Sequence, residues 1–259
     1  MKSLKSVKPL SVLPVILGIL MGSLGAAFGQ TPADKTAPGL NSAMPKLFGE
    51  NTNFIARVET HVYDKNNKET TSMPMGFEML GDRIRVDINM TQVKSSVMSP
   101  DFATTLKQMG MDQMTTIMLP DKKVVLTIYP GLKSYAETAM DKQELEDAKK
   151  DLKMKKNRLG KENVDGHPCE KEEVTLTDDK GNQQRATIWE AQDMNKFPIK
   201  MQLSEDNTSV IMNYRDIRLG RPADSHFQAP SGMVKFDSVN ALMSDAITKK
   251  MNAGNVGVK

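Results

Sequence analysis

The sequence predicts an α+β protein that is built on one large antiparallel sheet. Apolar and polar residues alternate along many short segments, and clusters of Gly, Pro, Asn and Asp separate those segments. A few other stretches show helical spacing instead, and no internal repeat of fixed period is present. We therefore assign residues 51–236 to one sheet domain with helical inserts.

Three strands are expected at the start of this domain. Apolar residues alternate with polar ones in residues 54–62 and again in residues 73–79. Gly81-Asp82 is a tight-turn dipeptide that leads into residues 83–90, where the alternation is complete. The three segments predict an antiparallel meander with one face exposed to water.

The middle of the chain is expected to add a short helix and two strands. Residues 101–109 follow Ser-Pro and precede Gly110, which are boundary signals of a helix. Residues 115–119 and 123–129 alternate again on either side of a Pro-Asp-Lys turn.

A charged helix is predicted at Asp141–Lys156. Asp141 is a suitable N-cap, and Glu144 stands at the capping-box position. Glu146 and Lys150 form a favourable i,i+4 pair. Because the apolar stripe is thin, we expect a solvated helix or an interdomain connector.

The C-terminal half is expected to hold four strands and a final helix. A hairpin lies in residues 159–197, and residues 199–203 and 210–219 alternate after it. The apolar phase slips before Ile217, which predicts a β-bulge. Residues 237–259 predict a short amphipathic helix and a tail that is loose from Asn252.

The N-terminus has the layout of a secretory signal peptide at residues 1–29. Three lysines precede an apolar run at residues 10–24, and small residues stand before a cleavage position at Gln30. The alternative, an uncleaved membrane anchor, is disfavoured by Pro14 and several glycines. Residues 30–50 predict a flexible leader. We expect a periplasmic or secreted protein with no integral membrane segment after cleavage.

Charge argues against a nucleic-acid-binding protein, and cysteine content excludes an intrachain disulfide. The chain has 35 Lys and Arg against 32 Asp and Glu, and three of the lysines leave with the signal peptide. The mature chain is then neutral, without the positive excess that a nucleic-acid-binding protein needs. A single Cys excludes an intrachain disulfide.

Motifs for catalysis are not found. The sequence has no phosphate-binding Gly-rich loop, paired-His metalloprotease motif or nucleophile elbow. The three histidines, His61, His167 and His226, are scattered. We expect a protein that is not an enzyme and that needs no cofactor.

Methionine is the compositional anomaly, with 20 residues, of which Met1 and Met21 belong to the signal peptide. Such flexible, polarizable side chains suit a plain core, or a cavity for a lipid or other apolar ligand. Both interpretations stay open. The residues expected to line such a cavity are Met73, Met75, Phe77, Met79 and Ile88.

A copper site is the third interpretation of the methionines, because thioethers bind soft metals in oxidising compartments. His167-Pro168-Cys169 could contribute an imidazole and a thiolate, since an extended backbone sends positions 167 and 169 to one face. The competing interpretation is a turn that leads to a buried, inert Cys. Cys169 is out of phase with Val174, which requires either a bulge or opposite faces. The metal-ligand candidates are His167, Cys169, Met109, Met111 and Met114.

A family resemblance adds to these predictions. The succession LGKENVDGHPCEKEEV, TIWEAQDMNKFPIKM and MNYRDI resembles a family of secreted bacterial proteins of unknown function. That family is distantly similar to the outer-membrane lipoprotein carriers of the LolA/LolB type. The resemblance covers residues 54–232. Its recognisable positions are Gly160, Gly166, Cys169, Trp189, Phe197-Pro198 and Lys200.

The resemblance implies an incomplete, strongly curved antiparallel β-barrel with helices that plug its open face. In the carriers the hollow shelters acyl chains. We therefore expect an exported, non-enzymatic protein that binds a lipid or other apolar ligand in a Met-lined concavity. The alternatives are a periplasmic copper-handling protein and a cell-envelope module that recruits a protein partner.

Overall fold

A computed structural model describes residues 44–96, 100–140, 152–177, 181, 183–205 and 208–255. The expected signal peptide and most of the expected leader lie outside these residues. The described strands form one 13-stranded sheet in the order β13-β7-β6-β5-β3-β2-β1-β12-β11-β10-β9-β8, with β4 paired to β2. All pairs are antiparallel except β13 with β7. The predicted α+β class with one large antiparallel sheet is confirmed.

The first half of the chain supplies one short helix and the expected meander before its helical insert. Its elements are α2 Met44–Leu47, β1 Asn53–Tyr63, β2 Glu69–Leu80, β3 Arg83–Asn89, η2 Met90–Gln92, β4 Lys94–Ser95, α3 Pro100–Met109, β5 Gln113–Leu119, β6 Val124–Tyr129, η3 Pro130–Leu132 and β7 Ser134–Ala139. Gly81, in the β2–β3 turn, has a φ of 64°, which glycine adopts without strain.

The second half of the chain extends the sheet beyond β1 and adds β13 at its opposite edge. Its elements are β8 Lys153–Val164, β9 His167–Thr177, β10 Gln183–Ala191, β11 Phe197–Glu205, β12 Thr208–Leu219, η4 Asp224–Phe227, β13 Val234–Phe236 and α5 Val239–Asn255. Ser238 caps α5, because its hydroxyl accepts a hydrogen bond from the Ala241 N–H at 3.1 Å.

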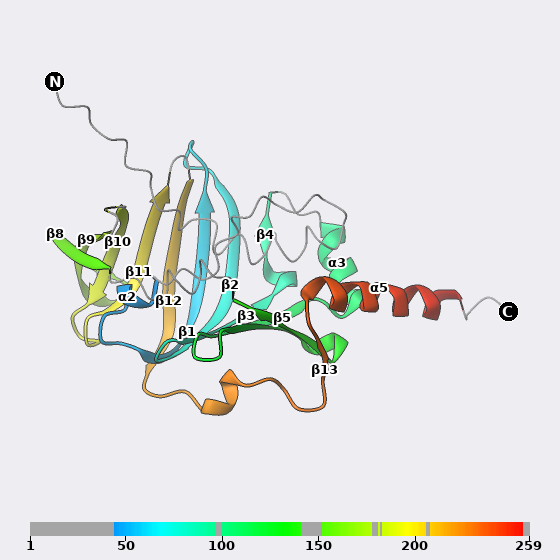
Figure 1. Ribbon diagram of the computed structural model, residues 1–259. Helices are drawn as coiled ribbons and strands as arrows, with labels where there is room; N and C mark the ends of the chain where they lie inside the picture. The colour runs from blue at the N-terminus through cyan, green and yellow to red at the C-terminus, as the bar shows by residue number, and fades with distance from the viewer. Residues whose placement is uncertain are drawn as a thin grey trace, which may run out of the picture.

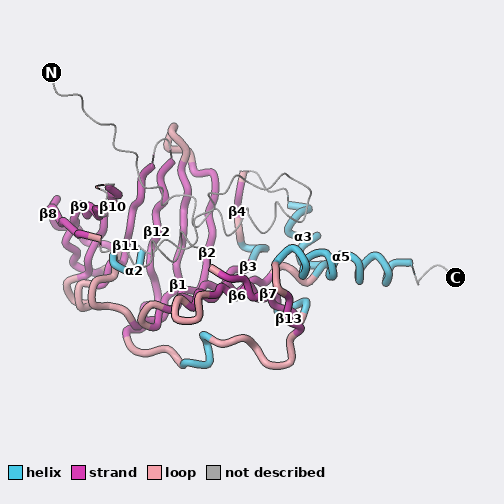
Figure 2. The backbone as a smooth tube through the Cα atoms, viewed as in Figure 1, coloured by secondary structure: helices cyan, strands magenta, loops and turns pink. Residues whose placement is uncertain are grey.

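The sheet is curved and open. Figure 1 shows β1, β2 and β12 standing side by side, whereas β3 and β5 run across them at a steep angle. The edge strands β8 and β13 do not pair with each other in the described part of the chain. Figure 2 shows α3 and α5 together at the β7 end of the sheet, and α2 against the strands of the other half.

The predicted bulge in the last long strand is confirmed. Ile55 of β1 pairs with Arg218, but Arg57 pairs with Arg215, so β12 carries one extra residue between these pairs. Asp216 takes up the extra residue with a φ of 51°, a left-handed conformation that Asp tolerates better than most residues.

The helix predicted at Asp141–Lys156 is wrong at its C-terminal end. Lys153–Lys156 belong to strand β8, and residues 141–151 lie outside the described part. β8 is an edge strand whose residues are mostly exposed on both faces, so it lacks alternation. Its lysines therefore resembled a solvated helix, although charged residues are also typical of edge strands.

Two other boundaries differ from the prediction. The leader expected up to Glu50 ends earlier, because α2 forms at Met44–Leu47 and Phe48 is buried. The C-terminal tail expected to be loose from Asn252 continues α5 as far as Asn255.

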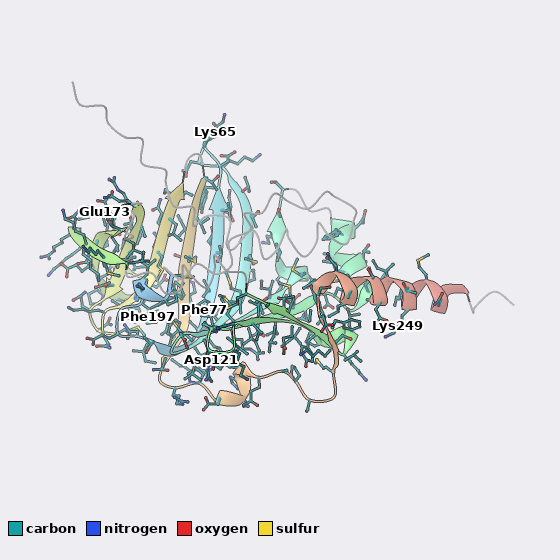
Figure 3. All side chains as sticks on the ribbon, viewed as in Figure 1. Lys65, Phe77, Asp121, Glu173, Phe197 and Lys249 are labelled. Atoms are coloured by element: carbon teal, nitrogen blue, oxygen red, sulfur yellow. The ribbon has the colours of Figure 1, made fainter. Side chains whose placement is uncertain are left out.

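Alternation gives the sheet an inner face, which carries Met73, Met75 and Met79, and an outer face on the opposite side. Most of the main core lies on the inner face. Phe48 is its centre, with ring centroids 4.8 Å from Phe54, 5.9 Å from Phe77 and 5.7 Å from Phe197. Figure 3 shows Phe77 and Phe197 near each other in the middle of the molecule.

A second, smaller core lies on the outer face. It joins six buried side chains: Leu80, Ile117, Leu119, Leu126, Ile128 and Phe227. Phe227 belongs to the strap, our name for residues 220–233 between β12 and β13. Figure 1 shows the strap passing outside the sheet.

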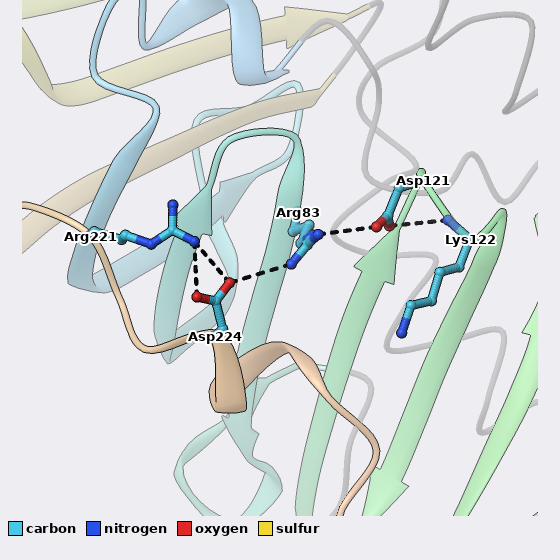
Figure 4. A network of polar contacts seen from close by, with 5 residues as sticks. All are labelled: Arg83, Asp121, Lys122, Arg221 and Asp224. Atoms are coloured by element: carbon cyan, nitrogen blue, oxygen red, sulfur yellow. Dashed lines mark hydrogen bonds and ion pairs between the residues drawn. The ribbon is translucent and has the colours of Figure 1, made fainter.

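Figure 4 shows one ion pair within the strap and a second that joins the strap to the sheet. Arg221 contacts both carboxylate oxygens of Asp224 at 2.9 Å. The Arg83 guanidinium of β3 lies 3.6 Å from the Asp224 carboxylate and 3.1 Å from the carboxylate of Asp121 in the β5–β6 turn. The Arg221 guanidinium, with Arg83 behind it, lowers the pKa of the Asp224 carboxyl.

Candidate functional site

The five residues expected to bind an apolar ligand lie together on the inner face. Met75 of β2 pairs with Ile88 of β3, and Phe77 and Met79 continue the same alternation. Met73, Met75, Phe77, Met79 and Ile88 are between 1% and 7% exposed. The alternation read from the sequence therefore placed all five on one face, and the structure packs them in the main core.

Many other methionines join the same core. They are Met44, Met90, Met111, Met114, Met118, Met140, Met201, Met212 and Met243. Their sulfur atoms also surround buried phenols: the Tyr214 hydroxyl lies 3.9 Å from the Met212 Sδ and 4.0 Å from the Met201 Sδ. Burial raises the pKa of the Tyr214 phenol, so this group stays neutral.

One polar atom on the inner face has no partner in the described part of the chain. The Thr60 hydroxyl is buried, the residue is 1% exposed, and no hydrogen bond reaches its Oγ1. Thr60 pairs with Met73 on one side and with Met212 on the other. An unpaired hydroxyl of this kind costs about 1–3 kcal/mol, so it calls for an explanation.

Helical segments cover the inner face. Phe48 follows α2, a helix of four residues, and packs over the strands around Phe54 and Tyr214. Leu106 of α3 and Leu242 of α5 belong to the same core at the β7 end. Of these helices, α2 has four residues and α3 has ten, whereas α5 has 17 and contacts β7 and β13.

The metal-ligand candidates separate into two groups. Met109, Met111 and Met114 lie where α3 leads into β5, whereas His167 and Cys169 lie on β9. Six strands stand between β5 and β9 in the sheet. The described residues also contain no group of three or more His, Cys, Asp or Glu that could hold a metal ion.

Cys169 and His167 are occupied by other contacts. The β9–β10 register is unbroken, so Cys169 faces away from Val174, on the outer face. Its thiol donates to the His167 carbonyl at 3.4 Å, and His167 Nδ1 contacts Asp193 at 2.9 Å. Burial raises the pKa of the Cys169 thiol, which disfavours the thiolate that metals bind.

Trp189 is enclosed on the same outer face. The Lys171 and Lys200 ammonium groups lie 4.9 and 4.5 Å from its ring centre, and its indole N–H donates to Glu162. The side chain is 3% exposed. These contacts make Trp189 a structural residue of the hairpin.

The outer face holds a feature that the sequence reasoning missed, an open pocket of about 960 Å³. It crosses β12, β1, β2, β3 and β5. Arg57, Gly76, Asp87 and Thr115 are successive register partners across four of these strands. Gly76 has no side chain, so the row has a gap there. The isolated Gly76 in an alternating strand was the sequence signal that could have indicated the pocket.

Arginines and carboxylates line this pocket, and all but one are paired. Arg85 contacts both oxygens of Asp87 at 2.8 Å, and Asp87 also accepts from the Thr115 hydroxyl at 2.5 Å. Arg57 contacts Asp216 at 3.1 Å. Arg218, which is exposed, has no ion pair among the residues that the structure describes.

Comparisons with known proteins give a family and a fold likeness. The profile of the family described as domain of unknown function (DUF4412) matches residues 65–197. No curated protein matches the chain. Across the described ranges, the helices are too short or too polar to span a membrane.

Three solved structures illustrate the fold likeness. A LolA superfamily protein from Nitrosomonas europaea has 8% identity, a TM-score of 0.35, and alignment over 70% of this chain and 91% of that chain. LprF from Mycobacterium bovis has 13% identity, a TM-score of 0.36 and coverage of 71% and 93%. The lipoprotein LppX from Mycobacterium tuberculosis has 10% identity, a TM-score of 0.35 and coverage of 68% and 92%.

Proposed function

The chain belongs to the DUF4412 family, and we propose that it is an exported, non-enzymatic protein that binds a lipid or other acyl-chain ligand on its Met-rich inner face. The observation that carries this proposal is the Thr60 hydroxyl on that face, which has no hydrogen-bond partner in the described part of the chain. A polar atom of a mostly apolar ligand, such as an ester carbonyl, would accept its hydrogen bond.

The surroundings of Thr60 suit such a ligand. Met73 and Met212 flank the hydroxyl, and unbranched thioether side chains adapt to ligands of irregular shape. An apolar ligand with one polar group would use the hydroxyl for orientation and the methionines for contact area.

Displacement of the cover is energetically feasible. Removing Phe48 from the core costs about 3 kcal/mol of burial, because a fully buried Phe contributes at most about that amount. Each buried methylene of an acyl chain returns about 0.8 kcal/mol, so four or five methylenes offset the loss. Because α2 has only four residues, it holds little helical stability of its own.

Native mass spectrometry of protein recovered from its own envelope tests the proposal. We expect an adduct with the mass of one acyl-bearing molecule, which organic extraction removes. A spectrum that contains only the bare polypeptide would contradict the proposal.

Thr60→Val sharpens this test because it removes the hydroxyl and keeps the shape. We expect the adduct to decrease at least severalfold, while the free energy of unfolding rises by about 1 kcal/mol since an unpaired buried group is gone. Thr187→Val, the same change on the outer face of β10, is the matched control and should leave the adduct unchanged. Equal adduct levels in the two variants would remove Thr60 from the site.

A further inference from the structure

The outer-face pocket lies on the side of the sheet opposite to the Met-rich face, so the acyl-chain proposal does not explain it. Its volume of about 960 Å³ is within the usual range of small-molecule sites. Its position depends on two local irregularities, the missing side chain at Gly76 and the bulge at Asp216. Bulges of this kind often lie next to binding sites, where they redirect side chains.

Of the three arginines that line the pocket, two form ion pairs with carboxylates of the pocket and one does not in the described part of the chain. Arg57 is neutralised by Asp216, and Arg85 by Asp87. Arg85 is held further because it donates to the His226 carbonyl at 2.9 Å. Arg218 follows the bulge directly and has no such partner in the described chain.

Apolar groups lie beside this cation. Ile55 is the register partner of Arg218, and Pro74 and Ile217 also line the pocket. The floor at Gly76 is open: a Cβ placed there would first meet the Asp87 Cβ at 3.4 Å. The pocket therefore combines a cation, an apolar wall and a floor without a side chain.

We infer that this pocket binds a compact organic anion, with a carboxylate or phosphate group on Arg218 and a small apolar body over Gly76 and against Ile55. The guanidinium of Arg218 forms paired hydrogen bonds with either anion. The other charged side chains of the pocket, Arg57 with Asp216 and Arg85 with Asp87, pair with each other and so fix the pocket walls. Long acyl chains are excluded from this proposal, because the opposite face serves them.

Two variants test the site without removing a stabilising contact. Arg218→Gln deletes the cation that has no ion pair among the described residues, and it costs little stability because the side chain is exposed. Gly76→Val fills the floor with a residue that favours strands, and its Cβ has room beside Asp87. Arg185→Gln, at an exposed position of β10, is the matched control.

The probes are 2-naphthoate, the neutral 2-naphthol and inorganic phosphate, each titrated calorimetrically into the exported protein. We expect saturable binding of 2-naphthoate, and binding at least about tenfold weaker for 2-naphthol and for phosphate, because each lacks one of the two recognised parts. Arg218→Gln and Gly76→Val should each weaken naphthoate binding about tenfold. Arg185→Gln and Thr60→Val should leave it unchanged.

Five outcomes overturn the inference, and the first four concern the probes and the two site variants. They are no saturable heat with 2-naphthoate at millimolar concentration, equal affinity for naphthoate and naphthol, unchanged affinity in Arg218→Gln, and unchanged affinity in Gly76→Val. A loss of naphthoate binding in Thr60→Val would place the probe on the inner face and would also contradict the inference. Circular dichroism of each variant confirms that the sheet is intact.

Discussion

The two faces of the sheet differ in how they are completed. The inner face carries one core with Phe48 at its centre, and the Thr60 hydroxyl within it has no hydrogen-bond partner among the described residues. The outer face has a small core under Phe227, and beside it charged side chains surround an open pocket. Because side chains alternate along a strand, one set of strands supports both environments. The comparison teaches that residues next to each other in sequence, such as Met75 and Gly76, face opposite sides of the sheet.

The largest expected effect is on the inner face. Phe48→Ala should lower the free energy of unfolding by about 3–5 kcal/mol, because the ring is 2% exposed and contacts four other aromatic rings. Denaturant unfolding measures this loss. A change below about 1 kcal/mol would mean that the Phe48 segment is not packed on the sheet.

The corresponding change on the outer face should be smaller. Phe227→Ala should cost about 3 kcal/mol, at the low end for a buried Phe, because its core has only six residues. The strap should also become sensitive to limited proteolysis within residues 220–233, whereas Phe48→Ala should leave the strap protected. If both variants expose the strap equally, the two cores are not independent.

The pH dependence of stability also distinguishes the two faces, because the Tyr214 phenol is buried on the inner face. Its phenol pKa is raised by desolvation, so above pH about 10 the unfolded chain loses a proton that the folded chain keeps. The unfolded state then binds fewer protons. The Tyr214 contribution to stability should therefore fall by about 1.4 kcal/mol per pH unit above that pH.

Tyr214→Phe is the control for this pH effect. Its stability at pH 7 should stay near that of the parent chain, because the hydroxyl makes only long contacts to sulfur. The steeper alkaline loss of the parent chain should disappear in the variant. Parallel curves for the two proteins would show that Tyr214 ionises in the folded state.

The smallest effect is expected for the strap's ion pairs. Arg83→Gln should lower the free energy of unfolding by at most about 1 kcal/mol, since Arg83 and both of its partners are at least one-third exposed. Thermal unfolding at low and high salt measures the loss, which should shrink at high salt. A loss comparable to that of Phe227→Ala would mean that charge, more than the Phe227 ring, holds the strap.

The alternating strands could be predicted from the sequence because their period of two is local. The meander β1–β3, the pair β5–β6 and the bulge before Ile217 all follow from that period. β8 could not be predicted, since edge strands are exposed on both faces and lose the pattern. β13 is a three-residue strand that pairs in parallel with the distant β7, so no local signal marks it.

The candidate sites divide in the same way. The Met-rich face was predictable, because Met73, Met75 and Met79 alternate within one strand. Thr60 was missed since its lack of a partner depends on neighbours in two other strands. The outer pocket was missed for the same reason: Arg57, Gly76 and Asp87 become a row only when three strands are in register.

Photo-crosslinking with a diazirine-labelled fatty acid tests the central claim most directly. After irradiation of the purified protein, peptide mass spectrometry maps the labelled residues. We expect labels on the inner face, around Thr60, Met73 and Met212, and a loss of labelling when unlabelled acyl chains compete. Labels confined to the outer face, at Ile55 or Ile217, or no saturable labelling at all, would contradict the assignment of the Met-rich face as the ligand-binding surface.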